Sequence, residues 1–131
     1  MNQIARYGLV AGTLALTTFV LGSAAVAQTT LSAPLPDNIR SRGQIIIGTY
    51  CDYPPFGYVG ADQSVQGIEV DYAHKVAELA FGKPDAVKFE CVKSDQRIPY
   101  LQTDKVDLLI SVLGVTVERA KVIDFSEPYF A

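Results

Sequence analysis

An arginine stands where a short helix is expected to begin: residues 111–129 read SVLGVTVERAKVIDFSEPY, and Arg119 follows an apolar run and a hydroxyl-bearing turn. A helix N-terminus carries partial positive charge and unpaired N–H groups, so a cation in the first turn is misplaced by a few tenths to about 1 kcal/mol. A guanidinium can grip a carboxylate through two parallel N–H bonds. The pattern therefore predicts either a bound organic anion or a surface ion pair with Glu118, Asp124 or Glu127.

Further residues suited to the same anion lie in three segments, at 50–56, 92–97 and 111–119. The candidate binding residues are Tyr50, Tyr53, Ser94, Arg97, Ser111, Val112, Gly114 and Arg119. Aromatic faces, hydroxyls, free backbone N–H groups and two guanidiniums together suit a small organic anion. Two alternatives stay open: Arg97 as a solvated helix residue, and Tyr53 with Phe56 as packing for their own loop.

Three apolar runs predict strands that would position these segments. The runs are 43–50 (GQIIIGTY), 87–92 (VKFECV) and 106–113 (VDLLISVL). Continuous runs of this kind are typical of parallel strands that are buried on both faces. Between the first two strands, residues 51–67 are predicted to form a loop, because Pro54, Pro55 and three glycines exclude regular structure.

Helical patterns predict the connections between the strands. Asp71 can cap a helix that ends at Gly82, with these residues facing inward: Ala73, Val76, Ala77, Ala80 and Phe81. Residues 95–104 predict a short helix, and Thr116 can cap a last helix over 117–123. The order β-α-β-α-β-α predicts an α/β fold with a parallel sheet. Ligands bind outside the carboxyl ends of such strands, where the three candidate segments meet.

The amino end predicts export from the cytoplasm. Residues 1–27 combine Arg6, an apolar stretch and Ala25-Val26-Ala27, which is the pattern of a cleaved signal peptide. The alternative is an uncleaved membrane anchor, but glycine and threonines interrupt the apolar stretch, and a spanning helix needs about 20 mainly apolar residues. Because Gln28 follows the cut rather than a cysteine, no lipid attachment is expected there. Residues 28–38 then lead into the fold.

Composition excludes several classes of protein. The formal net charge is −3, and no basic stripe is present, so no nucleic-acid partner is predicted. Residues 39–131 can make one modest core rather than two complete domains. The sequence has no Ser/His/Asp, zinc-ligand or phosphate-loop arrangement, so we predict no catalytic residue, metal or cofactor. His74 lacks a metal partner at a suitable spacing and is interpreted as structural.

Four stretches resemble a known family in order and spacing: IIIGTYCDYPPFGY, QGIEVDYAHKVAELAFG, RIPYLQTDKVDLLIS and GVTVERAKVIDFSEPYF. They are similar to the first lobe of the periplasmic amino-acid-binding proteins of ABC importers, solute-binding protein family 3. The resemblance covers residues 39–131. It implies a periplasmic-binding-protein-like (type II) lobe, whose partner lobe is absent from this chain, and a soluble periplasmic protein that delivers a polar amino acid to a membrane permease.

The resemblance also implies roles for individual residues. The family's carboxylate-binding arginine falls on Arg119, its covering aromatic on Tyr53, and the backbone groups of its binding turn on residues 112–114. Ser94 and Arg97 match a serine and an arginine that reach the ligand side chain in the glutamate/aspartate branch. That branch's further arginine falls on Tyr50, so glutamate, aspartate and their amides are only candidate ligands.

Two departures from the family pattern concern single residues. Gly114 replaces a frequent Ser or Thr, which removes a hydroxyl contact and leaves only the backbone N–H. Asp104 replaces a glycine that commonly closes the second helix, but Asp tolerates the left-handed conformation better than most residues.

A disulfide between Cys51 and Cys91 is expected on the same basis. Cys51 lies just past the first predicted strand and Cys91 near the end of the second, and these strands are neighbours in this fold. An exported location permits oxidation. The alternative is that the two side chains point to opposite faces of the sheet, in which case no bond can form.

Two other classes of function remain open. The same fold resembles periplasmic cyclohexadienyl dehydratases, although no general acid is identifiable here, and it also resembles receptor ectodomains, which would need a retained anchor. Residues 125–131 (FSEPYFA) end where the family's chain crosses into the second lobe, so a fragment or a truncated product is expected. A single lobe is expected to bind amino acids weakly.

Overall fold

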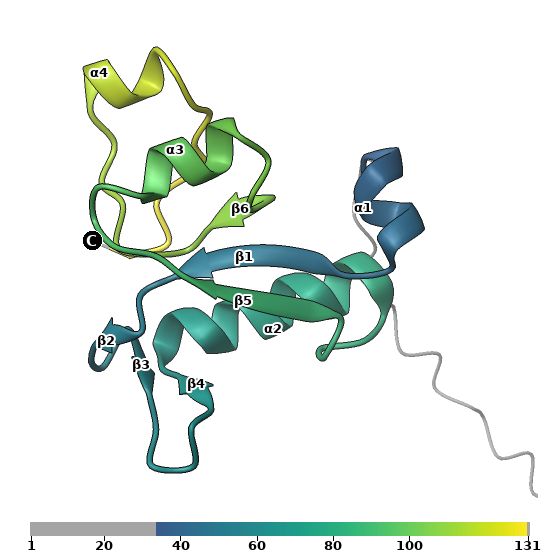
Figure 1. Ribbon diagram of the computed structural model, residues 1–131. Coiled ribbons are helices and arrows are strands. Elements are labelled where there is room, and N and C mark those ends of the chain that lie inside the picture. Colours follow the sequence, from purple (N-terminus) through teal and green to yellow (C-terminus); the bar gives the residue numbers. More distant parts are fainter. Residues whose placement is uncertain (1–33, 131) are drawn as a thin grey trace, which may run out of the picture.

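The computed structural model describes residues 34–130, which form one α/β unit (Figure 1). Its elements are, in order, α1 (Asp37–Arg42), β1 (Ile45–Thr49), β2 (Asp52–Tyr53), β3 (Gly57–Val59), β4 (Val65–Gln66), α2 (Ile68–Phe81), β5 (Val87–Cys91), α3 (Arg97–Gln102), β6 (Leu108–Leu109) and α4 (Val117–Ala120). Helix α1 begins two residues before the lobe boundary expected at residue 39. The signal peptide expected over residues 1–27 lies outside the described residues.

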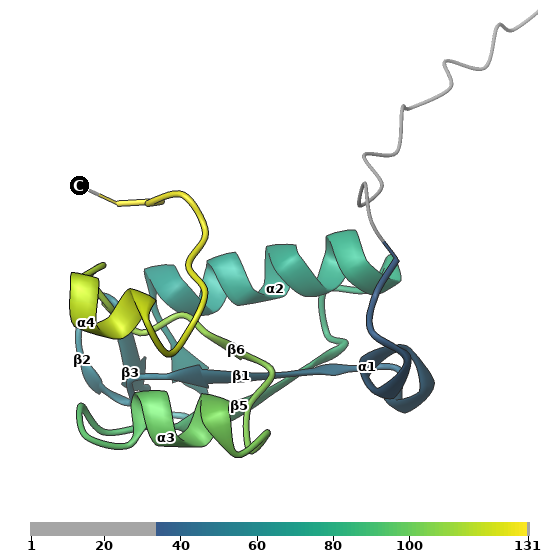
Figure 2. The same ribbon diagram turned by 90° about the horizontal axis from the view of Figure 1, so that it is seen from above.

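The main sheet has the strand order β5-β1-β6, and both pairings are parallel. In register, Ile45 lies opposite Val87 and Thr49 opposite Cys91, while Ile47 lies opposite Leu108. The predicted parallel α/β architecture is confirmed. Helix α2 covers one face of this sheet and α3 lies on the other, with β1 between them (Figure 2).

Helix α2 supplies much of the core. Ala73 and Ala77 are fully buried against Ile45, Ile47 and Ile110. Val76 and Phe81, also predicted to face inward, pack against the same cluster. Small residues on the inner face let the helix backbone approach the sheet closely. Burial of an apolar face of this kind provides most of the stability of a helix in a protein.

The start of α2 differs from the prediction. The helix begins at Ile68, with Gly67 as its N-cap, so Asp71 lies in the first turn and is not the cap. Gly67 has φ 129°, and a Cβ there would lie 2.2 Å from the carbonyl oxygen of Phe56. Only glycine fits such a close approach, which the capping pattern of the sequence does not reveal. The helix ends as predicted at Gly82, in the left-handed conformation.

The prediction of a structureless loop over residues 51–67 is wrong. Strands β2, β3 and β4 form a small antiparallel sheet there. Its second turn is closed by the hydrogen bond from Gly60 N to Ser64 O at 2.8 Å, and the Asp62 carboxylate accepts from Ser64 N and Oγ. Side chains of Tyr58 and Val59 alternate across the strand. Glycine and proline interrupt this ribbon without preventing strands of two or three residues.

The carboxyl-terminal elements are shorter than predicted. Strand β6 covers Leu108–Leu109 within the expected 106–113, and α4 covers Val117–Ala120 within the expected 117–123. Thr116 caps α4 as predicted, because its Oγ1 accepts from Arg119 N at 3.2 Å. Asp104 has φ 55°, so it adopts the left-handed conformation expected where a glycine is common.

Beyond α4, residues 121–130 run back toward α2 (Figure 2). The rings of Tyr129 and Tyr72 lie 5.2 Å apart, and those of Phe130 and Phe56 lie 5.5 Å apart. Long-range contacts therefore attach this segment to α2 and to the turn between β2 and β3.

Candidate functional site

Three loops leave the carboxyl ends of β1, β5 and β6, and side chains of the first two meet. Tyr50 Oη and Ser94 Oγ lie at hydrogen-bond distance, 2.8 Å. The Arg97 guanidinium carbon lies 5.2 Å from the centre of the Tyr50 ring, which permits a cation–π contact. The structure thus brings Tyr50, Ser94 and Arg97 into one cluster, as the order of strands predicted.

Arg97 does not lie on a solvated helix face, which was the alternative. Only 8% of its surface is exposed. Its Nη1 donates to the carbonyl oxygens of Ser111 at 2.9 Å and Val112 at 3.2 Å, and its Nε donates to Ser94 O at 3.3 Å. Arg97 therefore joins the second loop to the third. Within residues 34–130, Nη2 makes no protein hydrogen bond and stays available to a ligand.

The third loop contains a turn whose backbone is unusual. Val112 has φ 48°, an outlier for a β-branched residue. Its N–H, which was expected to face a ligand, donates instead to Glu69 Oε1 at 2.6 Å. Ser111 is 1% exposed, so its side chain does not reach an open surface. Gly114 has open space where a Cβ would stand, and its backbone remains accessible.

Arg119 lies beside this turn and is partly exposed. Its Nη1 donates to Gly114 O at 2.8 Å, which directs the guanidinium back over the turn. Across residues 34–130 it forms no ion pair, so the surface partners considered from the sequence, Glu118, Asp124 and Glu127, do not neutralise it. The remaining guanidinium nitrogens are free to bind an external anion.

The first loop presents an aromatic surface. Tyr53 is 51% exposed and stacks on Phe56, with ring centres 5.8 Å apart. Tyr53 also lies 5.5 Å from Tyr50. Its exposed face is therefore backed by other rings on one side, an arrangement that suits a side chain covering a ligand.

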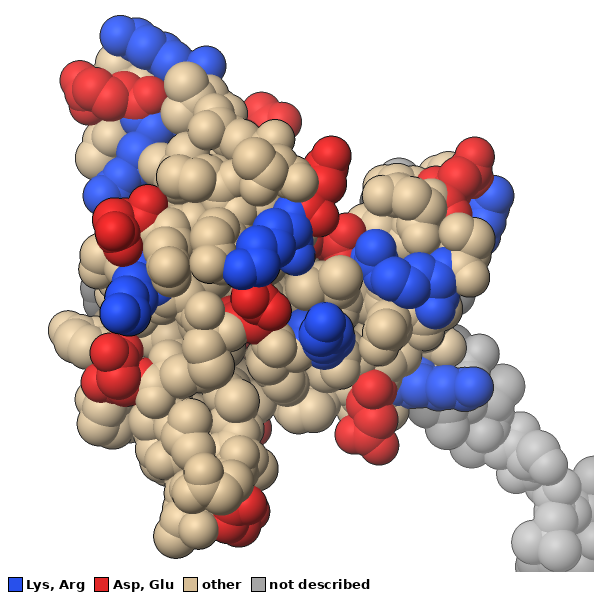
Figure 3. All heavy atoms as spheres, viewed as in Figure 1, with Lys and Arg blue, Asp and Glu red and all other residues tan. Residues whose placement is uncertain are grey.

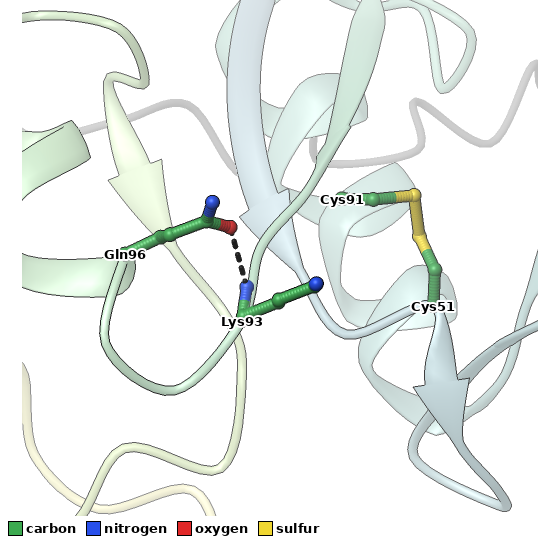
Figure 4. The surroundings of a disulfide bond; sticks show 4 residues. All are labelled: Cys51, Cys91, Lys93 and Gln96. Atoms are coloured by element: carbon green, nitrogen blue, oxygen red, sulfur yellow. Dashed lines mark hydrogen bonds between the residues drawn. A yellow bond between two sulfur atoms is a disulfide. The ribbon is translucent and has the colours of Figure 1, made fainter.

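A disulfide joins Cys51 to Cys91, with Cα atoms 5.5 Å apart (Figure 4). The two residues follow β1 and end β5, so the bond ties together the loops that carry Tyr50 and Ser94. Next to it, Lys93 N donates to Gln96 Oε1 at 3.0 Å, which closes the turn before α3. Of the two outcomes considered from the sequence, the structure has the one in which the cysteines share a side of the sheet.

A mainly apolar cavity of about 510 Å³ lies between residues 111–115 of the third loop and residues 123–130. Its walls include Glu69, Ser111, Val112 and Gly114 together with residues 123–130, but not Arg119, Tyr53 or Arg97. An apolar cavity offers little to a carboxylate. The guanidinium of Arg119 and the cluster of Tyr50, Ser94 and Arg97 suit an organic anion better than this cavity does.

Two residues of the site region escaped the sequence interpretation. Glu69 is 1% exposed, and Tyr129 donates its hydroxyl to Glu69 Oε1 at 2.8 Å. The sequence gives no distinct signal for Glu69, because acids are common in the first turn of a helix. Nothing local to Tyr129 indicates its partner, because the two residues lie 60 positions apart.

Other features of the described chain fit a binding role without adding chemistry. His74 Nδ1 lies 2.9 Å from Pro84 O and its ring packs on Phe89, which is a structural environment. Among residues 34–130, no group of three or more potential ligands could hold a metal ion, and no helix is long and apolar enough to cross a membrane. Acidic and basic side chains are interspersed on the face drawn in Figure 3.

Residues 45–131 match the family of bacterial extracellular solute-binding proteins, family 3. The chain belongs to this family. Members of the family typically work in the periplasm or outside the cell. Among similar curated proteins is a glutamine-binding protein of Geobacillus stearothermophilus, 33% identical over 95 residues, which are 72% of this chain and 36% of that protein. The glutamate/aspartate import solute-binding protein of Escherichia coli is 34% identical over 116 residues, covering 82% and 38%.

Solved structures agree with this assignment. A solute receptor for L-cysteine of Neisseria gonorrhoeae superimposes with a TM-score of 0.69 at 40% identity, over 70% of this chain and 37% of the receptor. The arginine-bound form of domain 1 from TmArgBP gives 0.67 at 38% identity, over 73% of this chain and 74% of that domain. The family 3 chain described here spans little more than a third of the length of the full-length relatives it matches.

Proposed function

We propose that this chain is the first lobe of an extracytoplasmic solute-binding protein that presents an amino acid to the permease of an ABC importer. The relatives are named as binding proteins for glutamine, cystine, arginine and glutamate/aspartate, which supports a free amino acid as the ligand class. The cleaved signal peptide over residues 1–27 and the periplasmic location belong to the same proposal.

The observation that carries the proposal is the unpaired guanidinium of Arg119. It is held over the turn at Gly114 by one hydrogen bond and makes no ion pair within the described residues. An α-carboxylate placed there would accept two bonds from the guanidinium, and the backbone N–H of Gly114 is a further donor. Tyr53 would cover the ligand, because its ring is exposed and lies 5.5 Å from Tyr50, which contacts Ser94 and Arg97.

Residues around the ligand side chain are proposed separately. Tyr50, Ser94 and the free Nη2 of Arg97 form one polar cluster. Hydroxyls and a guanidinium nitrogen suit an acidic or amide side chain, so glutamate, aspartate, glutamine and asparagine are the proposed ligands. Val112 and Ser111 contribute through the shape of the turn, because the Val112 N–H and the Ser111 carbonyl already have protein partners.

The proposal is tested by titrating the ¹⁵N-labelled chain with glutamine and with glutaminamide, whose α-carboxylate is replaced by a neutral amide. We expect glutamine to shift the amide resonances of Gly114 and Arg119 in a saturable way, and glutaminamide to leave them in place. Arg119→Lys should weaken the response at Gly114, by up to about 1 kcal/mol in the open lobe, and Arg40→Lys, on the exposed face of α1, is the matched control. Equal responses to both compounds would contradict carboxylate recognition.

Two other functions are less well supported. A dehydratase would need a general acid beside the bound ring, and incubation with prephenate followed by a search for phenylpyruvate tests for it. A receptor ectodomain would keep its amino-terminal anchor, and N-terminal sequencing of the exported protein distinguishes that case, because the transport proposal expects Gln28 as the first residue.

A further inference from the structure

Glu69 is a buried carboxylate with two donors on a single oxygen. Its Oε1 accepts from Val112 N at 2.6 Å and from Tyr129 Oη at 2.8 Å. The donors come from the turn after β6 and from the carboxyl-terminal segment, which are 43 and 60 residues away in the chain. One side chain at the start of α2 thus contacts both the proposed ligand turn and the segment that leaves the lobe.

Burying the Glu69 carboxylate costs free energy of folding, so its presence at this position needs an explanation. Glu69 is 1% exposed, and its Oε2 has no hydrogen-bond partner among the described residues. A buried charge without full compensation destabilises a fold, and an apolar side chain of similar volume is often equally stable or more so. Core packing alone therefore does not explain an acid here; the positive end of α2 favours one, and the two hydrogen bonds on Oε1 give this acid specific partners.

The backbone conformation of Val112 explains why an acid is present, because that conformation needs stabilising contacts from other residues. A β-branched residue at φ 48° is strained, and such a conformation persists only where the surroundings over-determine it. The Glu69 carboxylate accepts a hydrogen bond from the N–H of Val112, and Arg97 Nη1 donates one to the Val112 carbonyl oxygen at 3.2 Å. An anion and a cation thus hold the same residue at its two backbone groups.

The direction of the turn then decides where the binding groups stand. Gly114 comes two residues after Val112, and its carbonyl oxygen accepts from Arg119 Nη1. A change in the conformation of Val112 would rotate the peptides that follow and move this carbonyl. The guanidinium of Arg119 would lose its orientation as a consequence.

We propose that Glu69 is a positioning residue that fixes Val112 in its left-handed conformation, and so orients Gly114 and Arg119, and that Tyr129 ties this conformation to the carboxyl-terminal segment. The effect of Glu69 on ligand affinity rests on the proposed function, but its effect on the conformation of the turn does not. A ligand at the turn and a movement of residues 121–130 are then coupled through one carboxylate oxygen.

The test compares ¹H–¹⁵N spectra and amide hydrogen exchange in four single variants of the full chain, without ligand. Glu69→Gln should move the Val112 amide proton upfield and speed exchange at 112–114 by at least tenfold, because a short bond to a charged acceptor becomes a weaker bond to a neutral amide oxygen. Glu78→Gln, the same change on the exposed face of α2, is the control. Tyr129→Phe should also move the Val112 amide, with Tyr58→Phe as its control.

A rescue variant separates positioning from general destabilisation. Glycine adopts positive φ without strain, so Val112→Gly should make the turn independent of Glu69. In the Val112→Gly background, Glu69→Gln should therefore shift Gly114 and Arg119 by less than half as much as in the native background. Equal shifts in both backgrounds, or a Val112 amide that responds no more to Glu69→Gln than to Glu78→Gln, would overturn the proposal. If Glu69→Gln does not fold, Tyr129→Phe decides, since an unmoved Val112 amide there contradicts the link.

A glutamine titration of the same variants distinguishes the two proposals. Absence of binding to the native chain would count against the proposed function, while the ligand-free spectra would still decide the role of Glu69. Binding to the native chain and at least fivefold weaker binding to Glu69→Gln, restored toward native by Val112→Gly, supports both. Native-like affinity in Glu69→Gln with an unchanged turn overturns the positioning role alone.

Discussion

Tyr50 Oη and Ser94 Oγ lie 2.8 Å apart, although 44 positions separate the two residues in the chain. They meet because β1 and β5 are parallel neighbours in register, with Thr49 opposite Cys91. The disulfide joins Cys51, the residue after Tyr50, to Cys91, which ends β5 three positions before Ser94. Two independent links therefore hold the first and second loops of the proposed site together.

Replacing both cysteines, Cys51→Ser with Cys91→Ser, should lower the free energy of unfolding. The bond closes a loop with a sequence separation of 40 residues. In the chain-entropy model such a loop is worth roughly 4 kcal/mol. Urea unfolding of the native and double-variant chains measures the difference, and Ser41→Ala serves as a surface control. A loss below about 1 kcal/mol would show that the bond adds little to the fold.

Arg119→Lys should weaken amino-acid binding, because a forked contact to the α-carboxylate becomes a single point-charge contact. In the open lobe the arginine is hydrated, so the loss should be about 0 to 1 kcal/mol. In a two-lobe protein that excludes water, truncating such a pair costs about 2 to 5 kcal/mol. Calorimetry on this chain, and on the same chain joined to a second lobe, compares the two values. Unchanged affinity in both would leave Arg119 without a ligand role.

Arg97→Ala should affect the fold as well as ligand choice. The change leaves the carbonyl oxygens of Ser111 and Val112 without a donor, and an unsatisfied buried acceptor costs about 1 to 3 kcal/mol. Thermal unfolding measures this loss. If the free Nη2 also meets the ligand, glutamate should lose more affinity than alanine does. A uniform loss for all amino acids would limit Arg97 to holding the turn.

Tyr129 makes stability fall at high pH. Burial, followed by the hydrogen bond and the charge of Glu69, raises the pKa of the Tyr129 hydroxyl above its ordinary value. The unfolded chain releases this proton near pH 10 while the folded chain retains it, so the contribution is complete below about pH 10 and declines as the pH rises further. Tyr129→Phe should flatten this decline between about pH 10 and 11 in urea unfolding curves. An identical slope in the variant would contradict the assignment.

The chain alone should bind amino acids only in the millimolar range. One lobe leaves the ligand hydrated on its open side, and association must still overcome at least about 4 kcal/mol of lost rigid-body freedom. An NMR titration of the monomeric chain measures the dissociation constant. Micromolar affinity would mean that one lobe suffices for tight binding.

Local patterns in the sequence predicted the frame of the fold. The run from Ile45 to Thr49 is apolar enough to be a central parallel strand, and Gly82 and Thr116 mark helix ends through their own backbone and side-chain preferences. Such features depend on residues that are close in sequence, so they are legible without coordinates. The left-handed conformation of Asp104 was expected instead from the family resemblance, because glycine is common at this position in the family. Once the three strands were predicted to be parallel, the loops at their carboxyl ends could be predicted to lie at one edge of the sheet.

The three-dimensional structure alone decided which polar groups pair within those loops. Arg97 turns inward to two backbone carbonyls, and Glu69 accepts from Val112 and Tyr129. Among the described residues, the guanidinium of Arg119 pairs with no carboxylate. The residue types allowed every one of these groups to face solvent or a ligand instead. Partners 15, 43 and 60 positions apart come within hydrogen-bond distance only after the sheet and α2 have packed. A hydrogen bond depends on distances of a few tenths of an ångström. Strand register and the path of the loops set these distances, and neither can be predicted from the residues that neighbour each partner in the sequence.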